Sequence, residues 1–334
     1  MVGLDTFKLK LPIDHVKGIN YSKFSDTETK SQKGIEIRNV DIHKNIDYGL
    51  NAIQVDNLRG EIIISGSAKI LKDNYKQSIS LNTLDQFTEE INKHGFIEVA
   101  SDKLLRSTLL VCDPVNTMRV TDLNKSVRSV IQFANMNSSY EVGSYLTKGS
   151  LGYTAKRKVK SYKERQVGYS KLHDLKKDKH NRDFSKDYPK MIRSFNLNDI
   201  RVESNIVAKS QMKKHFKVVN TSLGSILNSS ENVNSNVFQR IIKTGVQMDL
   251  FSDSFMSMAM TKIVKEYGYK SIFNQFGNNW DKVEQWIKVK MPRGKSNSAY
   301  YQINIFKDAF QRLNDIDSSV NTSIEELSYL LKQA

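Results

Sequence analysis

Residues 150–171 read SLGYTAKRKVKSYKERQVGYSK, and this stretch decides the expected fold. Apolar and aromatic side chains, among them Val159, Tyr162, Val167 and Tyr169, interleave with a dense series of cations. A run of charge is usually a solvated helix or a disordered arm, but interleaved apolar residues favour ordered strands. We therefore predict a β-hairpin with one basic face, which makes the surrounding sheet antiparallel at this point.

Patterns on both sides of the hairpin extend the sheet and add helices. Residues 5–12, 107–115 and 198–207 read as strands, and residues 60–71 as strand, turn and strand. Residues 83–96 and 123–136 have helical spacing, and Asp122 is a suitable N-cap for the second. The expected fold class of residues 1–210 is α+β, a mostly antiparallel sheet with helices on one face.

The pattern changes near residue 210, and residues 211–334 are expected to form an all-helical C-terminal part. Residues 251–269, 279–291, 299–313 and 323–334 have helical patterns, while residues 227–237 read as a polar linker. The sequence VKMPRGKS at 289–296 and the pair Tyr300–Tyr301 favour a tail that grips duplex DNA or self-associates. A plain helical cap on the first domain explains the same pattern.

The chain is strongly basic, with a formal net charge of +15 over 334 residues. Eleven Lys or Arg residues against three acids lie between Lys156 and Arg182. Such clustering predicts a nucleic-acid partner, because cations that contact phosphates release counterions. No apolar run is long enough for a membrane span, so we expect no membrane partner. The residues expected to bind DNA are Lys156, Arg157, Lys158, Lys160, Lys163, Arg165 and Arg201.

Several motifs are missing from the sequence. It has no phosphate loop, no histidine pair with the spacing of a metal site, and a single cysteine. A metal ion would therefore be held by carboxylates, which suit Mg²⁺ or Mn²⁺. Asp113 and Glu203 lie in otherwise apolar strands and are candidate ligands. The pattern alone favours an ion pair of Glu203 with Arg201 or a nearby lysine over metal binding, because a buried charge needs a partner.

Three short elements occur in a characteristic order. An apolar strand ends in Asp113, the sequence GYSKLHDLK at 168–176 follows the basic hairpin, and IRVESNI at 200–206 comes next. This series resembles the replication initiators of filamentous phages, the gene II and X group, and more distantly the rolling-circle initiators of Gram-positive plasmids. Val111 stands where those proteins carry an arginine, and Asp174 where they carry a glutamate. The resemblance covers residues 3–210.

The resemblance implies that the protein nicks and rejoins DNA at an origin. Tyr169 would be the nucleophile that forms a 5′-phosphotyrosyl link, with Lys171 as its electrostatic partner. Asp113, Asp174 and Glu203 would hold Mg²⁺ or Mn²⁺. Tyr169 and Lys171 would point to the same face of one strand. Without the resemblance, the pattern favours Tyr169 as one packed aromatic residue among fourteen tyrosines.

The expected partners follow from the same reading. They are origin DNA, single-stranded and as supercoiled duplex, together with a host helicase and polymerase, and a second copy of the chain in a homodimer. The expected location is the cytoplasm of a bacterial host. Two functions of other classes remain open: a non-catalytic DNA-binding protein, such as a repressor or packaging factor on the same fold, and an RNA-binding module with stacking tyrosines.

Overall fold

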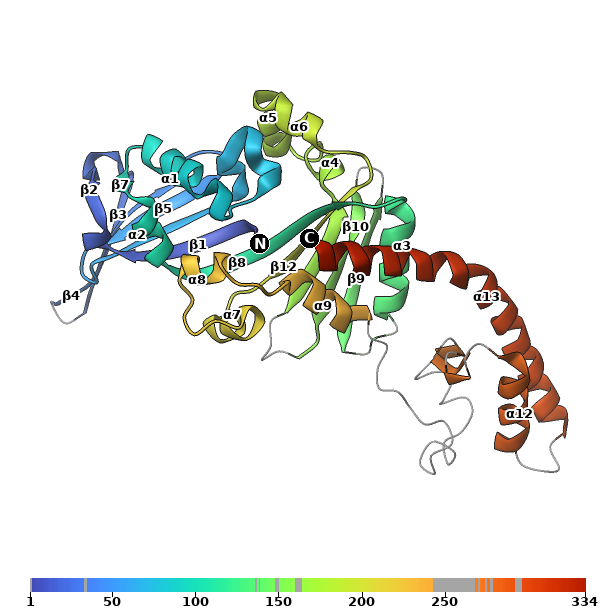
Figure 1. The fold of residues 1–334 in the computed structure, drawn as a ribbon. Helices are drawn as coiled ribbons and strands as arrows, with labels where there is room; N and C mark the ends of the chain where they lie inside the picture. Colours follow the sequence, from blue (N-terminus) through green and yellow to red (C-terminus); the bar gives the residue numbers. More distant parts are fainter. Residues whose placement is uncertain are drawn as a thin grey trace.

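A ten-stranded sheet forms the centre of this computed structural model (Figure 1). The structure describes residues 2–32, 35–135, 137, 139–147, 150–159, 164–242, 268–269, 271–273, 275–276, 279–291 and 296–334. The strand order is β3-β4-β5-β6-β1-β8-β12-β11-β10-β9, and each pairing of named strands in these ranges is antiparallel. The α+β class predicted from the sequence is confirmed.

The strands of the main sheet come partly in direct succession, as β3 to β6 and β9 to β11 do, and helical segments separate the others. The strands are β1 (Leu4–Pro12), β3 (Asp26–Gln32), β4 (Ile35–Lys44), β5 (Leu50–Asp56), β6 (Glu61–Ser67), β8 (Thr108–Arg119), β9 (Tyr140–Thr147), β10 (Ser150–Arg157), β11 (Arg165–Ser170) and β12 (Asp199–Asn205). A small second sheet pairs β2 (Val16–Ile19) with β7 (Ile97–Val99). Four 3-10 segments are η1 (Ile13–His15), η2 (Tyr21–Lys23), η3 (Ala68–Gln77) and η4 (Leu81–Thr83).

Most of the described helices are short, and α13 is much the longest. They are α1 (Leu84–Lys93), α2 (Ser101–Arg106), α3 (Leu123–Asn135), α4 (Lys171–Asp174), α5 (Lys179–Asp187), α6 (Pro189–Ser194), α7 (Lys209–Phe216), α8 (Leu223–Leu227), α9 (Val233–Ile242), α12 (Trp280–Lys290) and α13 (Ser296–Gln333).

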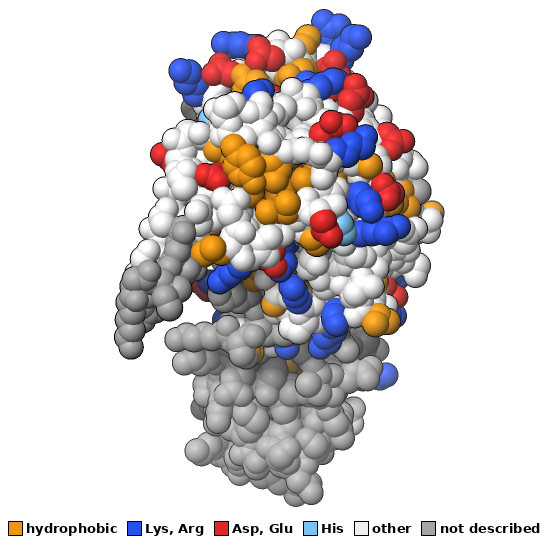
Figure 2. Space-filling view, turned by 90° about the vertical axis from the view of Figure 1, so that its left-hand side faces the viewer, with side chains coloured by type: hydrophobic (Ala, Val, Ile, Leu, Met, Phe, Trp, Pro, Cys, Tyr) orange, Lys and Arg blue, Asp and Glu red, His pale blue; other side chains and the backbone are white. Residues whose placement is uncertain are grey.

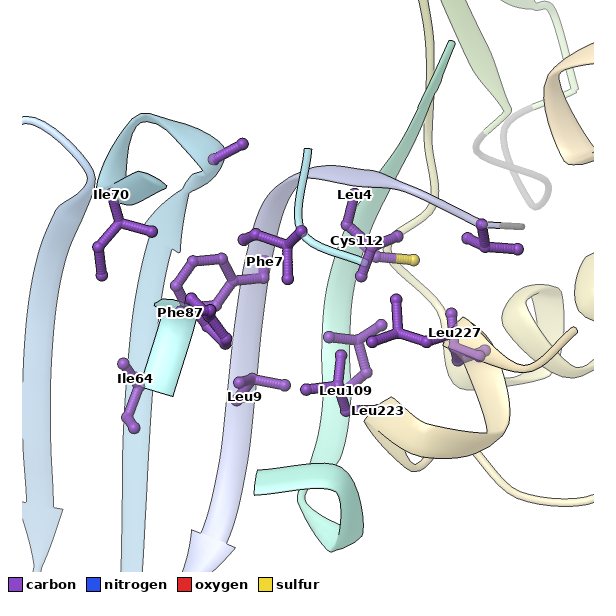
Figure 3. Close-up of a cluster of buried hydrophobic side chains, with 14 of the residues drawn as sticks. Leu4, Phe7, Leu9, Ile64, Ile70, Phe87, Leu109, Cys112, Leu223 and Leu227 are labelled. Atoms are coloured by element: carbon purple, nitrogen blue, oxygen red, sulfur yellow. The ribbon is translucent and has the colours of Figure 1, made fainter. Parts of the chain in front are cut away.

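The main hydrophobic core lies under β1, β6 and β8 (Figure 3). Phe7 and Leu9 alternate with lysines along β1, so one face of the strand is buried and the other stays polar. The Phe7 ring meets that of Phe87 from α1 edge to face, with centroids 5.0 Å apart. Leu223 of α8 packs in the same cluster, so a helix that follows residue 210 shares the core of the sheet.

A second core covers the same sheet at its other half. Ile200 and Val202 of β12 are buried against α3, α9 and the last turns of α13. Asn234 of α9 is fully buried, and its side-chain amide donates to the backbone carbonyls of Pro114 and Val202. The polar linker predicted at 227–237 is therefore wrong in its second half: from Val233 the chain is a helix whose polar side chain binds the sheet.

Other local predictions can be compared directly. The hairpin is confirmed, with β10 and β11 paired from Gly152–Tyr169 to Lys156–Arg165. The Asp122 cap of α3 is confirmed by a 2.9 Å hydrogen bond from the Lys125 backbone amide. The second strand predicted within 60–71 is wrong. That segment turns into η3, because Ile70 and Leu71 reach the core from a 3-10 turn.

The C-terminal part is helical where the structure describes it. The two helices predicted at 299–313 and 323–334 are one helix, α13, because the turn signals between them do not interrupt it. A small third cluster joins α12 to α13 around Trp286 and Phe306. The helix predicted at 251–269 lies almost entirely outside the described residues. The domain boundary at residue 210 stays a prediction.

The end of the molecule that carries β3 and β4 has mixed charge. Figure 2 views that end and shows Lys and Arg interspersed with Asp and Glu around a hydrophobic patch. The predicted DNA-binding residues that the structure describes belong to β10, β11 and β12 and to the residue that follows β10, in the other half of the sheet. Among the described helices, none is long and apolar enough to cross a membrane.

Candidate active site

One face of β11, β12 and β8 brings the candidate residues together. Arg201 of β12 pairs with Tyr169 on one side and with Thr117 on the other. Glu203, two residues later, pairs with Val167 and Val115. Residues that are directly opposite in an antiparallel pair share a face, as do residues two apart in one strand. Tyr169, Arg201 and Glu203 therefore stand on the same side of the sheet.

The Tyr169 hydroxyl has two polar partners. It donates a 2.6 Å hydrogen bond to Glu203 Oε1 and accepts one of 3.1 Å from Lys171 Nζ. The Lys171 ammonium also donates to Asp174 Oδ2 at 2.8 Å. Lys171 is not on the strand as predicted, since β11 ends at Ser170 and Lys171 opens α4. The long Lys171 side chain still reaches the Tyr169 hydroxyl.

Arg201 is the buried centre of the cluster. Its guanidinium pairs with Asp5 of β1 and with Glu203, where Nε donates at 2.8 Å. The Tyr75 ring of η3 lies 4.7 Å from it, measured from the guanidinium carbon to the ring centroid. The ion pair considered for Glu203 is thus present. The predicted DNA contact for Arg201 is not supported: its side chain is fully buried and already neutralises two carboxylates.

The neighbouring carboxyl groups of Asp5 and Glu203 have pKa values shifted in opposite directions. Burial would raise the pKa of Asp5, but Arg201 and then Lys171 outweigh burial and hold it below its ordinary value. Burial, followed by the charge of Asp5, raises the pKa of Glu203 to about 7. Glu203 also hydrogen-bonds to Asp5. The pair therefore keeps one proton up to nearly neutral pH, carried mainly by Glu203.

The protonation of Tyr169 and Lys171 follows from the same surroundings. Burial and then Glu203 raise the pKa of the Tyr169 hydroxyl well above 10, so the resting residue is a neutral phenol. Burial by itself would lower the pKa of the Lys171 ammonium. The surrounding groups Tyr169, Tyr75 and Asp5 outweigh burial and raise this pKa well above 10.5. Lys171 is therefore a fixed positive charge at the phenol oxygen.

Asp113 lies on the same face, one strand beyond Glu203. Its Oδ1 accepts a 2.7 Å hydrogen bond from the Asn205 amide, and Thr6 is a second partner. Burial raises its pKa to about 6. In the part of the chain that the structure describes, no three Asp, Glu, His or Cys side chains form a group that could by itself hold a metal ion. Asp113 and Asp174 stay predictions as ligands.

A cavity of about 210 Å³ opens beside Tyr169. Arg165, His173 and Lys177 line it, together with the exposed ring of Tyr145 from β9. The His173 ring is held by Ser170, with Oγ 2.6 Å from Nδ1. A substrate in this cavity would lie against Tyr169 and next to the cations of Arg165 and Lys177.

The remaining predicted DNA-binding residues lie around the hairpin. Lys156 and Arg165 are exposed and directly opposite each other on the Tyr169 face. Arg157 is half-buried and Lys158 is exposed. Lys160 and Lys163 lie outside the described residues.

Sequence reasoning missed four residues of this site: Asp5, Tyr75, Tyr145 and His173. Asp5 had a usable signal, since it is an acid at the start of an apolar strand, the same signal that marked Asp113. The other three had none, because their proximity to Tyr169 depends on strand order and on the path of η3 and α4.

Comparison of the chain with protein-family models, with curated proteins and with solved structures finds no match.

Proposed function

We propose that the protein is a rolling-circle replication initiator that nicks and rejoins DNA at an origin. The observation that carries this proposal is the Tyr169 hydroxyl, held between Glu203 Oε1 at 2.6 Å and Lys171 Nζ at 3.1 Å, in a residue that also lines a cavity with basic walls. A packed tyrosine needs one hydrogen-bond partner. A carboxylate and a buried ammonium on one phenol oxygen are the partners of a nucleophile.

The residues support attack of Tyr169 on a DNA phosphodiester. The phenol oxygen forms a bond to phosphorus, and its proton passes to Glu203, whose pKa of about 7 suits a general base near neutral pH. The Lys171 ammonium stabilises the charge that develops on the phenol oxygen. The bond from phosphorus to the 3′ oxygen breaks, and that oxygen takes up a proton to become a free 3′ hydroxyl. Reversal of these steps rejoins the strand without ATP.

Mg²⁺ or Mn²⁺ is the cofactor of this proposal. Asp113 is the predicted ligand that would hold it, because Arg201 already pairs with Asp5 and Glu203, and Lys171 pairs with Asp174. Mg²⁺ is commonly held by one or two carboxylates plus substrate phosphates. When bound, the ion supplies positive charge to the phosphate.

The DNA path in this proposal follows the basic hairpin. Lys156 and Arg165 stand exposed on the face that carries Tyr169, where they can contact the sugar-phosphate backbone. Origin DNA is the substrate, single-stranded or in a supercoiled duplex. A host polymerase would extend the free 3′ hydroxyl while a host helicase unwinds the duplex. This would take place in the cytoplasm of a bacterial host, with the protein acting alone or as a homodimer.

Nicking of supercoiled origin plasmid in Mg²⁺ tests the proposal. The wild-type protein should produce nicked circles that carry a covalently bound peptide, and mass spectrometry should place the link on Tyr169. Tyr169→Phe keeps the ring and removes the nucleophile, so it should bind DNA without nicking it. Tyr329→Phe, a change at an exposed tyrosine of α13, is the matched control. DNA binding with no nicked circle would favour a non-catalytic DNA-binding protein instead.

A further inference from the structure

Two tyrosines face each other across a glycine next to the candidate nucleophile. Gly152 of β10 pairs with Tyr169 of β11 on one side and with Tyr145 of β9 on the other. All three residues share one face of the sheet. Neighbouring strands lie about 4.8 Å apart, so the backbones of the two tyrosines are about 10 Å apart. Both tyrosines line one cavity, which we call the slot.

The close approach of β10 and β11 requires glycine at position 152. A Cβ atom on Gly152 would lie 2.7 Å from the Gly168 carbonyl oxygen and 2.7 Å from Tyr169 Cβ. The slot has a volume of about 210 Å³, which is smaller than the roughly 300–1,000 Å³ of pockets that enclose whole drug-sized ligands. It has room for one flat ring system that enters from the open side.

The walls of the slot suit one nucleotide. Tyr145 lines the slot and is 43% exposed, so its ring is open to a ligand. Arg165 lies over β10, where its Nε donates to Thr154 Oγ1 at 3.2 Å, and Lys177 is exposed three residues after the end of α4. A ring that stacks on aromatic faces and carries phosphates beside it is a base of a nucleic-acid strand.

We infer that Tyr145 is the base-stacking residue of this site. Its ring stacks on one unpaired base of single-stranded DNA that enters the slot, and Arg165 and Lys177 hold the flanking phosphates so that one of them reaches Tyr169. This inference rests on the proposed function and adds a residue that sets which strand, and which position in it, is cut. A base in a duplex is stacked on its neighbours, so the slot selects single-stranded DNA.

The test uses the non-cleaving Tyr169→Phe protein and a short single-stranded oligo(dT) with one 2-aminopurine. Stacking on Tyr145 should quench the fluorescence of that base at one position of the strand. Tyr145→Ala should weaken binding about tenfold, the usual effect of losing one stacked base, and abolish the quenching. Tyr145→Trp should keep both. Tyr329→Ala, at another exposed tyrosine, on α13, should change neither.

A second measurement leaves Tyr145 in place. An abasic site at the quenched position should weaken binding by the same factor, and in Tyr145→Ala the abasic site should have no further effect. Unchanged affinity of Tyr145→Ala, with origin nicking by the wild type intact, would overturn this inference and leave the proposed function standing. A protein that neither binds the oligonucleotide nor nicks an origin would overturn both.

Discussion

Replacing Glu203 by glutamine should remove a pH dependence of stability that the Asp5–Glu203 pair creates. Glutamine has the shape of a protonated glutamate and can still accept from Tyr169 and Arg201 through Oε1. It cannot ionise. At pH 8 the wild-type pair carries two buried negative charges next to each other, while the variant carries one.

The magnitude follows from the pKa of Glu203, which burial raises from its ordinary 4.5 to about 7. Because the folded pKa lies above the unfolded one, this carboxyl stabilises the fold most below pH 4.5, and the contribution is lost as pH rises through 7. The full contribution is about 3 kcal/mol, of which about 2.5 kcal/mol is lost between pH 5 and pH 8. The variant should not lose it.

Urea unfolding of both proteins at pH 5, 6, 7 and 8 measures the effect. The difference in the free energy of unfolding, variant minus wild type, should rise by about 2.5 kcal/mol across this range. Other titrating groups, including Asp113, are present in both proteins and cancel. Glu61→Gln, at a half-exposed ion pair with Lys10, is the control and should give a nearly constant difference. A constant difference for Glu203→Gln would refute the coupled-pair reasoning.

Four further outcomes follow from the same geometry. Nicking in single-turnover assays should rise about tenfold per pH unit and level off near pH 7, because Glu203 must be ionised to accept the Tyr169 proton; a flat profile from pH 5 to 7 would contradict this. Lys171→Met should lower the nicking rate on the order of a hundredfold, and an unchanged rate would remove Lys171 from the mechanism. Asp113→Asn should reduce nicking, with partial recovery at high Mn²⁺; equal loss at every metal concentration would assign it a structural role. Lys156→Ala should lower the slope of log binding constant against log salt by about one in filter-binding titrations, and an unchanged slope would place Lys156 away from the DNA.

Local patterns predicted most of the sheet around the site. The alternation in residues 198–207 placed Arg201, Glu203 and Asn205 on one side, and the contacts of these residues with Tyr169, Asp5 and Asp113 agree. Such predictions succeed because side chains alternate along a strand whatever its neighbours are. They failed at η3, where packing of Ile70 and Leu71 in the core favours a 3-10 turn over a strand. They also failed at Lys171, because the strand ends at Ser170 and α4 begins at the next residue.

The sequence by itself determined the element types, the basic hairpin and the two acids in apolar strands, because these depend on residues close together in the chain. Only the tertiary structure decided which of them meet. Asp5 lies 196 residues from Arg201, and their contact exists because β1 and β12 both pair with β8. Tyr75 belongs to η3, and Tyr145 belongs to β9, two strands away from the β11 strand that carries Tyr169. The pKa of about 7 at Glu203 comes from burial and from Asp5, so it too belongs to the folded state. Strand order and burial are collective properties of the packed chain, and no short stretch of sequence carries them.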